Sequence, residues 1–204
     1  FRATARWAEY SSRFVEFLRS EGLRNFRGRR FTKGSPGAVL ASFGANDRNP
    51  SFDREGGLPE DMYHMARSSF RGPSAKPLEA LPANRIGNPE GFEIDGRFYT
   101  LSWLNHYCRY AYASTFFDFD DQIIVEVGPG CGKQAEMLKR AHRNLTILLF
   151  DLPTQLYVCN QYLSKVFAGS DQVIDYRKGR EVADLSEIKR GCINILPHWK
   201  FPIL

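Results

Sequence analysis

The chain has 204 residues, of which 43% are apolar and 14% aromatic, so it can bury a core of ordinary size. Its 28 basic and 23 acidic residues leave a formal net charge of +5, which excludes a chain kept unfolded by charge repulsion. No apolar run approaches the length of about 18 residues that predicts a membrane span, and the first residues lack the apolar core of a signal peptide. We therefore expect a globular, cytoplasmic protein that does not partner a membrane.

The cysteines and histidines give no metal-binding or disulfide pattern. Cys108, Cys131, Cys159 and Cys192 lie far apart in the sequence, and the four histidines are equally scattered. This spacing predicts reduced thiols, with no C-x-x-C pair and no dedicated metal site.

Residues 1–97 are predicted to be helical at the start and irregular afterwards. Apolar residues at helical spacing predict an amphipathic helix over residues 4–19 that ends near Gly22. Residues 1–33 hold nine basic and three acidic side chains, which we interpret as a solvated helix face and a basic loop. The few aromatic residues of this arm make no stacking platform for nucleic acid. Frequent Gly and Pro in residues 34–97 exclude long elements, apart from a short helix around residues 59–69 and a tight hairpin at Asp95-Gly96.

Residues 98–204 alternate predicted helices with short apolar runs. We expect helices over residues 101–117, 132–143, 154–167 (with Thr154 as a cap) and 183–190, and strands over residues 122–127, 145–150, 172–176 and 192–196. The nearly continuous apolar run at residues 122–127 is typical of a strand buried on both faces of a parallel sheet. The alternation predicts an α/β fold, namely a Rossmann-like, doubly wound parallel sheet.

A glycine loop stands where the first of these strands turns into a helix, in the sequence Gly128-Pro129-Gly130-Cys131-Gly132. Ligands of open α/β sheets bind outside the carboxyl ends of the strands, where this loop is expected. Glycine enters the left-handed region without steric cost and leaves the backbone open to a ligand. The following helix would offer free N–H groups and the positive end of its dipole.

Two carboxylates accompany the loop. Glu126 lies inside the apolar run, where a carboxylate needs a partner, either a ligand cation or donor, or an internal N–H group or arginine. Asp151 ends the next strand, 21 residues after Gly130, where nucleoside sites place an acid on the ribose hydroxyls. The alternative for Asp151, beside Leu152, is a cap for the helix that follows.

The spacing of the loop leaves two ligand classes open. Starting at Gly130, the sequence fits G-x-G-x-x-A, the pyrophosphate fingerprint of nicotinamide and flavin enzymes, but starting at Gly128 the third position is Lys133. The tighter G-x-G-x-G after a carboxylate favours S-adenosylmethionine, whose amino and sulfonium groups are cationic. A NAD(P)-dependent oxidoreductase and a non-catalytic cofactor-binding fragment stay as alternatives.

Several short motifs carry a resemblance to a known family. They are Ile124–Gly132 with Leu149–Pro153, preceded by Gly87-Asn88-Pro89, Ile94-Asp95-Gly96, Thr100 and Arg109-Tyr110-Ala111-Tyr112, and followed by Asn160-Gln161-Tyr162-Leu163 and Ile195-Leu196-Pro197. From about residue 85 onward the chain resembles the sugar O-methyltransferases among the class I S-adenosylmethionine-dependent methyltransferases. The first 80 residues match only as a variable region, and Cys131 replaces a residue that is often aromatic or small.

The resemblance implies a cofactor site and an acceptor. Glu126, Gly128, Pro129, Gly130, Cys131 and Gly132 would surround the methionine portion, Asp151 with Leu152 would hold the ribose, and a sugar or glycan hydroxyl would accept the methyl group. Only three or four strands of the family's seven-stranded sheet fit into residues 98–204, so we expect a truncated domain with one open apolar edge and without the general base. We assign no catalytic residue, because the aromatic helix around His106 and Tyr110 is predicted to be core.

Overall fold

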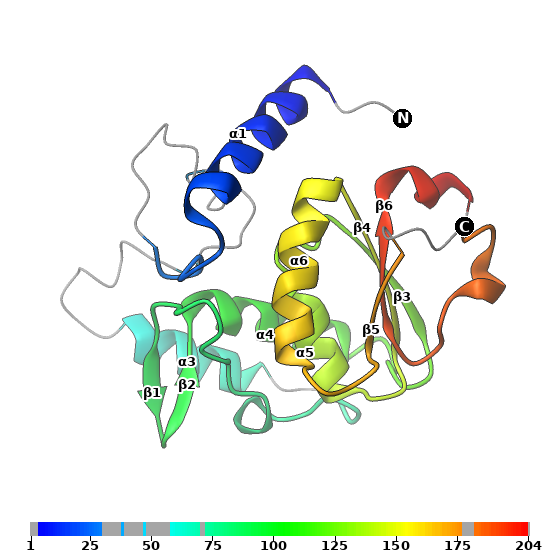
Figure 1. Ribbon diagram of the computed structural model, residues 1–204. Coiled ribbons are helices and arrows are strands. Elements are labelled where there is room, and N and C mark those ends of the chain that lie inside the picture. Colours follow the sequence, from blue (N-terminus) through cyan, green and yellow to red (C-terminus); the bar gives the residue numbers. More distant parts are fainter. Residues whose placement is uncertain are drawn as a thin grey trace.

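The computed structural model describes residues 4–29, 38, 47, 58–69, 72–176 and 182–203 (Figure 1). Much of the irregular segment predicted within residues 34–97, and the end of the basic arm at residues 30–33, lie outside the described residues. Within the described part, no helix has the length and apolar character needed to cross a membrane.

The C-terminal half forms a mixed α/β structure around one parallel sheet. Its strands are β3 (Ile123–Val127), β4 (Thr146–Asp151), β5 (Val173–Asp175) and β6 (Ile193–Pro197), in the order β3-β4-β6-β5 with every pair parallel. Helix α5 (Lys133–Ala141) joins β3 to β4, and α6 (Pro153–Val166) joins β4 to β5. This arrangement confirms the predicted α/β class and is compatible with a Rossmann-like fold.

The two faces of the sheet are covered differently. Helices α5 and α6 lie on one face, which holds Ile147 and Leu149 in the main core, and α6 contacts β4, β5 and β6 (Figure 1). Leu148 and Phe150 point to the opposite face, where a smaller cluster includes Val182 and where the 3-10 helix η4 (His198–Ile203) packs. Within the described residues, α-helices therefore cover one face of the sheet only. The second helical layer of the predicted doubly wound sheet is not seen, and the described chain on that face forms short 3-10 helices and loops.

The N-terminal elements pack against the helical side. Helix α1 (Ala5–Glu21) contacts α6, and α3 (Leu58–Ser68) contacts α4 (Leu101–Ala113), which in turn lies on α5 (Figure 1). Strands β1 (Phe92–Ile94) and β2 (Arg97–Tyr99) form the predicted hairpin, with positive φ at Asp95 and Gly96 as a two-residue turn of this kind requires. A 3-10 helix, η2 (Leu78–Ala80), precedes them. The main core cluster includes residues from both sides of residue 97, and the predicted domain boundary there stays a prediction.

Several local predictions were wrong. The strand at residues 123–127 is not buried on both faces: it is an edge strand, with Val125 49% and Val127 68% exposed. Residues 183–190 form only the 3-10 helix η3 (Leu185–Glu187), which Asp184 caps by accepting from the Ser186 N–H at 2.6 Å. The helix that starts at Leu101 ends at Ala113, four residues before the predicted end.

The basic arm and the expected helix cap also differ from their predictions. Arg27, interpreted as part of a solvated loop, is completely buried. Thr154 does not cap α6, because the N-cap position is Leu152 and Thr154 Oγ1 instead lies 3.1 Å from Ser11 Oγ of α1. All four cysteines are free thiols.

Candidate functional site

The glycine loop between β3 and α5 has the backbone that the sequence pattern predicts. Gly128, Gly130 and Gly132 all have positive φ, with values of 78°, 58° and 94°. A side chain at Gly128 would meet no atom within 4 Å, so this position faces open space. A Cβ at Gly132 would come within 2.9 Å of Leu163 and 3.0 Å of Cys159 in α6. The first glycine therefore leaves room for a ligand, and the last permits close packing between helices.

Glu126 and Asp151 lie on the same face of neighbouring strands, near their carboxyl ends. Glu126 pairs in register with Leu149, and Asp151 follows Leu149 by two residues, so both acidic side chains point to the side of the sheet that carries α5 and α6. The negative charge of Asp151 contributes to the raised pKa of Glu126, in keeping with the positions of the two residues on neighbouring strands. The structure thus brings together the two acids that the sequence singled out.

Glu126 is half-buried, and one of its oxygens has no hydrogen-bond partner in the protein. Its Oε2 atom is inaccessible to solvent and accepts no hydrogen bond. Burial raises the pKa of Glu126 to about 7, an effect that the Arg109 cation opposes and the Asp151 charge reinforces. A buried carboxylate in this state lacks the compensation that burial of a charge requires. Glu126 is therefore suited to bind a cation or a hydrogen-bond donor supplied by a ligand.

Asp151 is held at the end of β4 by a local contact. Its Oδ1 atom accepts a hydrogen bond from the Leu152 N–H at 2.7 Å. Leu152 is the N-cap residue of α6, and no side chain caps this helix. Burial raises the pKa of Asp151 to about 6, and the bond from Leu152 opposes this rise. The cap interpretation of Asp151 is therefore not supported by the geometry, and the second carboxylate oxygen is available for a ligand hydroxyl.

A buried ionic cluster behind the loop was missed by sequence reasoning. Lys133, the first residue of α5, extends its Nζ atom to Asp47 Oδ1 and to Ser102 Oγ, both at 2.7 Å. Asp47 also pairs with Arg27, and these two cations hold the pKa of Asp47 below its ordinary value despite its burial. The cluster fixes the start of α5, and hence the loop, against the N-terminal region. Lys133 and Asp47 are 86 residues apart in sequence, so no local sequence pattern indicates the cluster.

Cys131 belongs to the packing of the loop. It is buried, and burial raises the pKa of its thiol. A thiol of this kind is inert, because the thiolate is the reactive form. Pro129 is buried as well, whereas Leu152 is half-buried beside Asp151.

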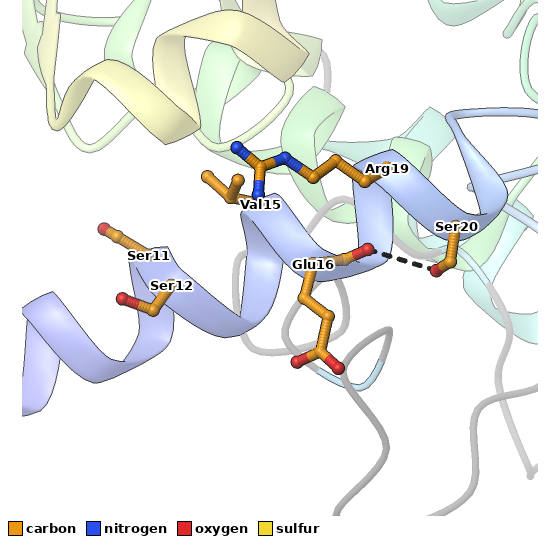
Figure 2. Close-up of a pocket in the computed structure, with 6 residues that line it drawn as sticks. All are labelled: Ser11, Ser12, Val15, Glu16, Arg19 and Ser20. Carbon is orange, nitrogen blue, oxygen red and sulfur yellow. Dashed lines mark hydrogen bonds between the residues drawn. The ribbon is translucent and has the colours of Figure 1, made fainter.

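One shallow hollow lies along α1, and none of these residues lines it. Figure 2 shows its lining side chains, which are Ser11, Ser12, Val15, Glu16, Arg19 and Ser20. The serines hydrogen-bond to carbonyls of the same helix or, for Ser11, to Thr154. The hollow therefore offers no activated group, and the carboxyl edge of the sheet is the stronger candidate site.

Among the described residues, no three His, Cys, Asp or Glu side chains are grouped to hold a metal ion.

Comparison with known proteins assigns no function to the site. No family model, curated protein or solved structure matches the chain.

Proposed function

We propose that the protein binds S-adenosylmethionine at the carboxyl edge of β3 and β4 and transfers its methyl group to a sugar or glycan hydroxyl. The observation that carries the proposal is the buried Oε2 atom of Glu126, which has no partner and lies beside the glycine loop. Glu126 would bind the ammonium group of the methionine portion, and Asp151 would accept from the ribose hydroxyls. The finer fold proposed with this function is that of a class I methyltransferase.

The charges of the site favour this cofactor over NAD. A pyrophosphate carries two negative charges, and placing it on the glycine loop would bring it towards Glu126 and Asp151. Like charges in a site of low dielectric repel strongly, whereas the ammonium and sulfonium groups of S-adenosylmethionine are attracted there. The two carboxylates therefore support a cationic ligand.

The acceptor class rests on the family resemblance of the short motifs between residues 87 and 197. Methyl transfer is an in-line displacement, so the protein has to align the acceptor oxygen behind the methyl group. A sugar hydroxyl also needs a general base, and we assign none. The residues named above serve the cofactor: they bind its charges, hold the ribose and leave the backbone of the loop open to it.

The proposal is tested by calorimetric titration of the full chain with S-adenosylhomocysteine and with NAD. We expect binding of S-adenosylhomocysteine and no binding of NAD. Asp151→Ala is expected to weaken S-adenosylhomocysteine binding by about 10- to 100-fold, the worth of a hydrogen bond to a charged group. Asp171→Ala removes an exposed aspartate in the turn after α6 and is the matched control, with affinity unchanged.

Three results would contradict the proposal. They are binding of NAD in preference to S-adenosylhomocysteine, binding of neither ligand, and an Asp151→Ala variant that binds S-adenosylhomocysteine as tightly as the wild type. The last result would refute the ribose assignment of Asp151 in particular.

A further inference from the structure

A second cavity lies where three distant segments of the chain meet. The turn after α1, the loop before β1 and the C-terminal half of α6 line it, and its volume is about 240 Å³. The Phe26 ring meets the Tyr162 ring edge to face, with the ring centroids 6.3 Å apart. The Arg27 N–H donates to the Gly87 carbonyl at 3.0 Å. These contacts fix the three segments against one another, so the cavity is part of the fold.

This cavity, which we call the α6 cavity, is separate from the glycine loop. Cys159 and Leu163 of α6 lie against Gly132 of that loop. Gln161 and Lys165 of the same helix line the cavity. Residues two apart on an α-helix point in nearly opposite directions, so the loop and the cavity lie on different sides of α6. A ligand in the cavity would therefore leave the glycine loop free.

The side chains of the α6 cavity carry positive charge and hydrogen-bond donors. None of the described residues that line it is acidic, whereas two are cations and two are amides: Arg24, Lys165, Asn25 and Gln161. Across the described part of the chain, Arg24 and Lys165 make no hydrogen bond or ion pair. A cavity lined by charges of one sign concentrates counter-ions, so this one attracts an anion.

A third cation lies behind the wall of the cavity. The Arg27 guanidinium donates to the Ile86 carbonyl at 3.1 Å and to the Tyr162 hydroxyl at 3.4 Å, and these two acceptor residues line the cavity. Arg27 is completely buried and shares the carboxylate of Asp47 with Lys133, so one negative charge faces two positive charges. This surplus of positive charge in the low dielectric of the interior adds to that of the two surface cations.

We propose that the α6 cavity binds the phosphate group of a small ligand, with Arg24 and Lys165 holding its oxygens. The proposal does not rest on the proposed function, because no residue of the glycine loop takes part. A phosphate monoester carries up to about two negative charges and three acceptor oxygens, which match two cations and nearby amide donors. The Arg24 guanidinium can bind two of these oxygens at once, and the Lys165 ammonium acts as a point charge.

The size of the cavity limits the ligand. At about 240 Å³ it lies just below the range of about 300–1,000 Å³ that is typical of sites for small molecules. Inorganic phosphate and the phosphate monoester of a small polyol are ligands of suitable size. The amides of Asn25 and Gln161 can hydrogen-bond to the hydroxyls of a polyol, so the ester would gain contacts that inorganic phosphate lacks.

The test is a calorimetric titration of the full chain with inorganic phosphate, glycerol 3-phosphate and glycerol at constant ionic strength. We expect binding of a phosphate and none of glycerol. Arg24→Ala and Lys165→Ala are each expected to weaken phosphate binding by about tenfold, the lower end of the worth of a hydrogen bond to a charged group, because both side chains reach solvent. Arg190→Ala removes an exposed arginine that precedes β6 and is the matched control, with affinity unchanged. Circular dichroism checks that each variant is folded.

The outcomes decide between the cavity and a general effect of charge. The proposal is refuted if the wild type binds neither phosphate, or if both cavity variants bind as tightly as the wild type. Equal weakening by Arg190→Ala would also refute it, because binding would then follow the net charge of the protein. A loss confined to the cavity variants supports the site. In that case, tighter binding of glycerol 3-phosphate than of inorganic phosphate identifies a monoester as the ligand, and the reverse identifies free phosphate.

Discussion

Replacing Glu126 by Gln is expected to remove part of the pH dependence of the protein's stability. The pKa of Glu126 is raised by burial to about 7, from an ordinary value of 4.5. The unfolded chain releases this proton at lower pH than the folded chain, so the folded protein binds the extra proton between pH 4.5 and 7. The contribution of the Glu126 carboxyl group to the unfolding free energy is complete below pH 4.5 and is lost as the pH rises through 7.

The size of this effect follows from the two pKa values. A difference of about 2.5 between them corresponds to about 3 kcal/mol of unfolding free energy once the carboxyl group is fully ionised in both states. Between pH 5 and pH 8 the part that changes is about 2–3 kcal/mol. Glutamine has no proton to release in this range, so the unfolding free energy of Glu126→Gln should fall by about 2–3 kcal/mol less than that of the wild type over the same interval. Asp151 remains in both proteins, and its own contribution largely cancels in the comparison.

The measurement is urea denaturation of the wild type and the variant at pH 5 and pH 8, without ligand. The glutamine amide of the variant lowers the unfolding free energy equally at both pH values. This cost therefore cancels when the change between pH 5 and pH 8 is compared with that of the wild type. Glu60→Gln, at an exposed glutamate in the first turn of α3, is the control and should follow the wild type. If the unfolding free energies of the wild type and Glu126→Gln change equally between pH 5 and pH 8, the reasoning is refuted. Glu126 would then have the same pKa in the folded and the unfolded chain.

Further substitutions test the surroundings of the site. Asp47→Asn is expected to lower the unfolding free energy in urea by about 3–5 kcal/mol, because Arg27 and Lys133 would stay buried without their counter-charge; a loss below about 1 kcal/mol would contradict the role of the cluster. Gly132→Ala is expected to lower it by about 2–4 kcal/mol, since the new Cβ meets α6, whereas Gly128→Ala should cost only about 1–2 kcal/mol of backbone strain. Equal losses at the two glycines would refute the packing difference.

Much of the fold could be predicted because it depends on local periodicity. The strands, the hairpin at Asp95-Gly96 and the inward stripe of α6 through Leu156, Cys159 and Leu163 all follow from residues close together in sequence. The burial of β3 could not be predicted in this way. An apolar run shows that a strand prefers two covered faces, but whether neighbours cover them depends on the order of strands in the sheet.

The same division applies to the candidate site. Glu126 and Asp151 could be placed together from sequence, because parallel strands that end in register bring their last residues to one edge. Lys133 was interpreted only as a residue that breaks a fingerprint, and its partner Asp47 comes from a distant segment. The aromatic helix before β3 is predicted to be core, and Trp103, Leu104 and Tyr107 of α4 are indeed buried. Arg109 on the same helix is exposed.

The buried acids of this protein differ in a way that separates structure from function. Asp47 has two cationic partners, and Glu136 has Arg140 and the amide of Asn84, so both are compensated within the chain. Glu126 alone among the carboxylates of the described residues keeps a buried oxygen without a partner. A ligand that ionises Glu126 on binding would recover the lost stability, because anything that binds only the folded state stabilises it. Under the proposed function, a cation that arrives with the ligand would remove this cost.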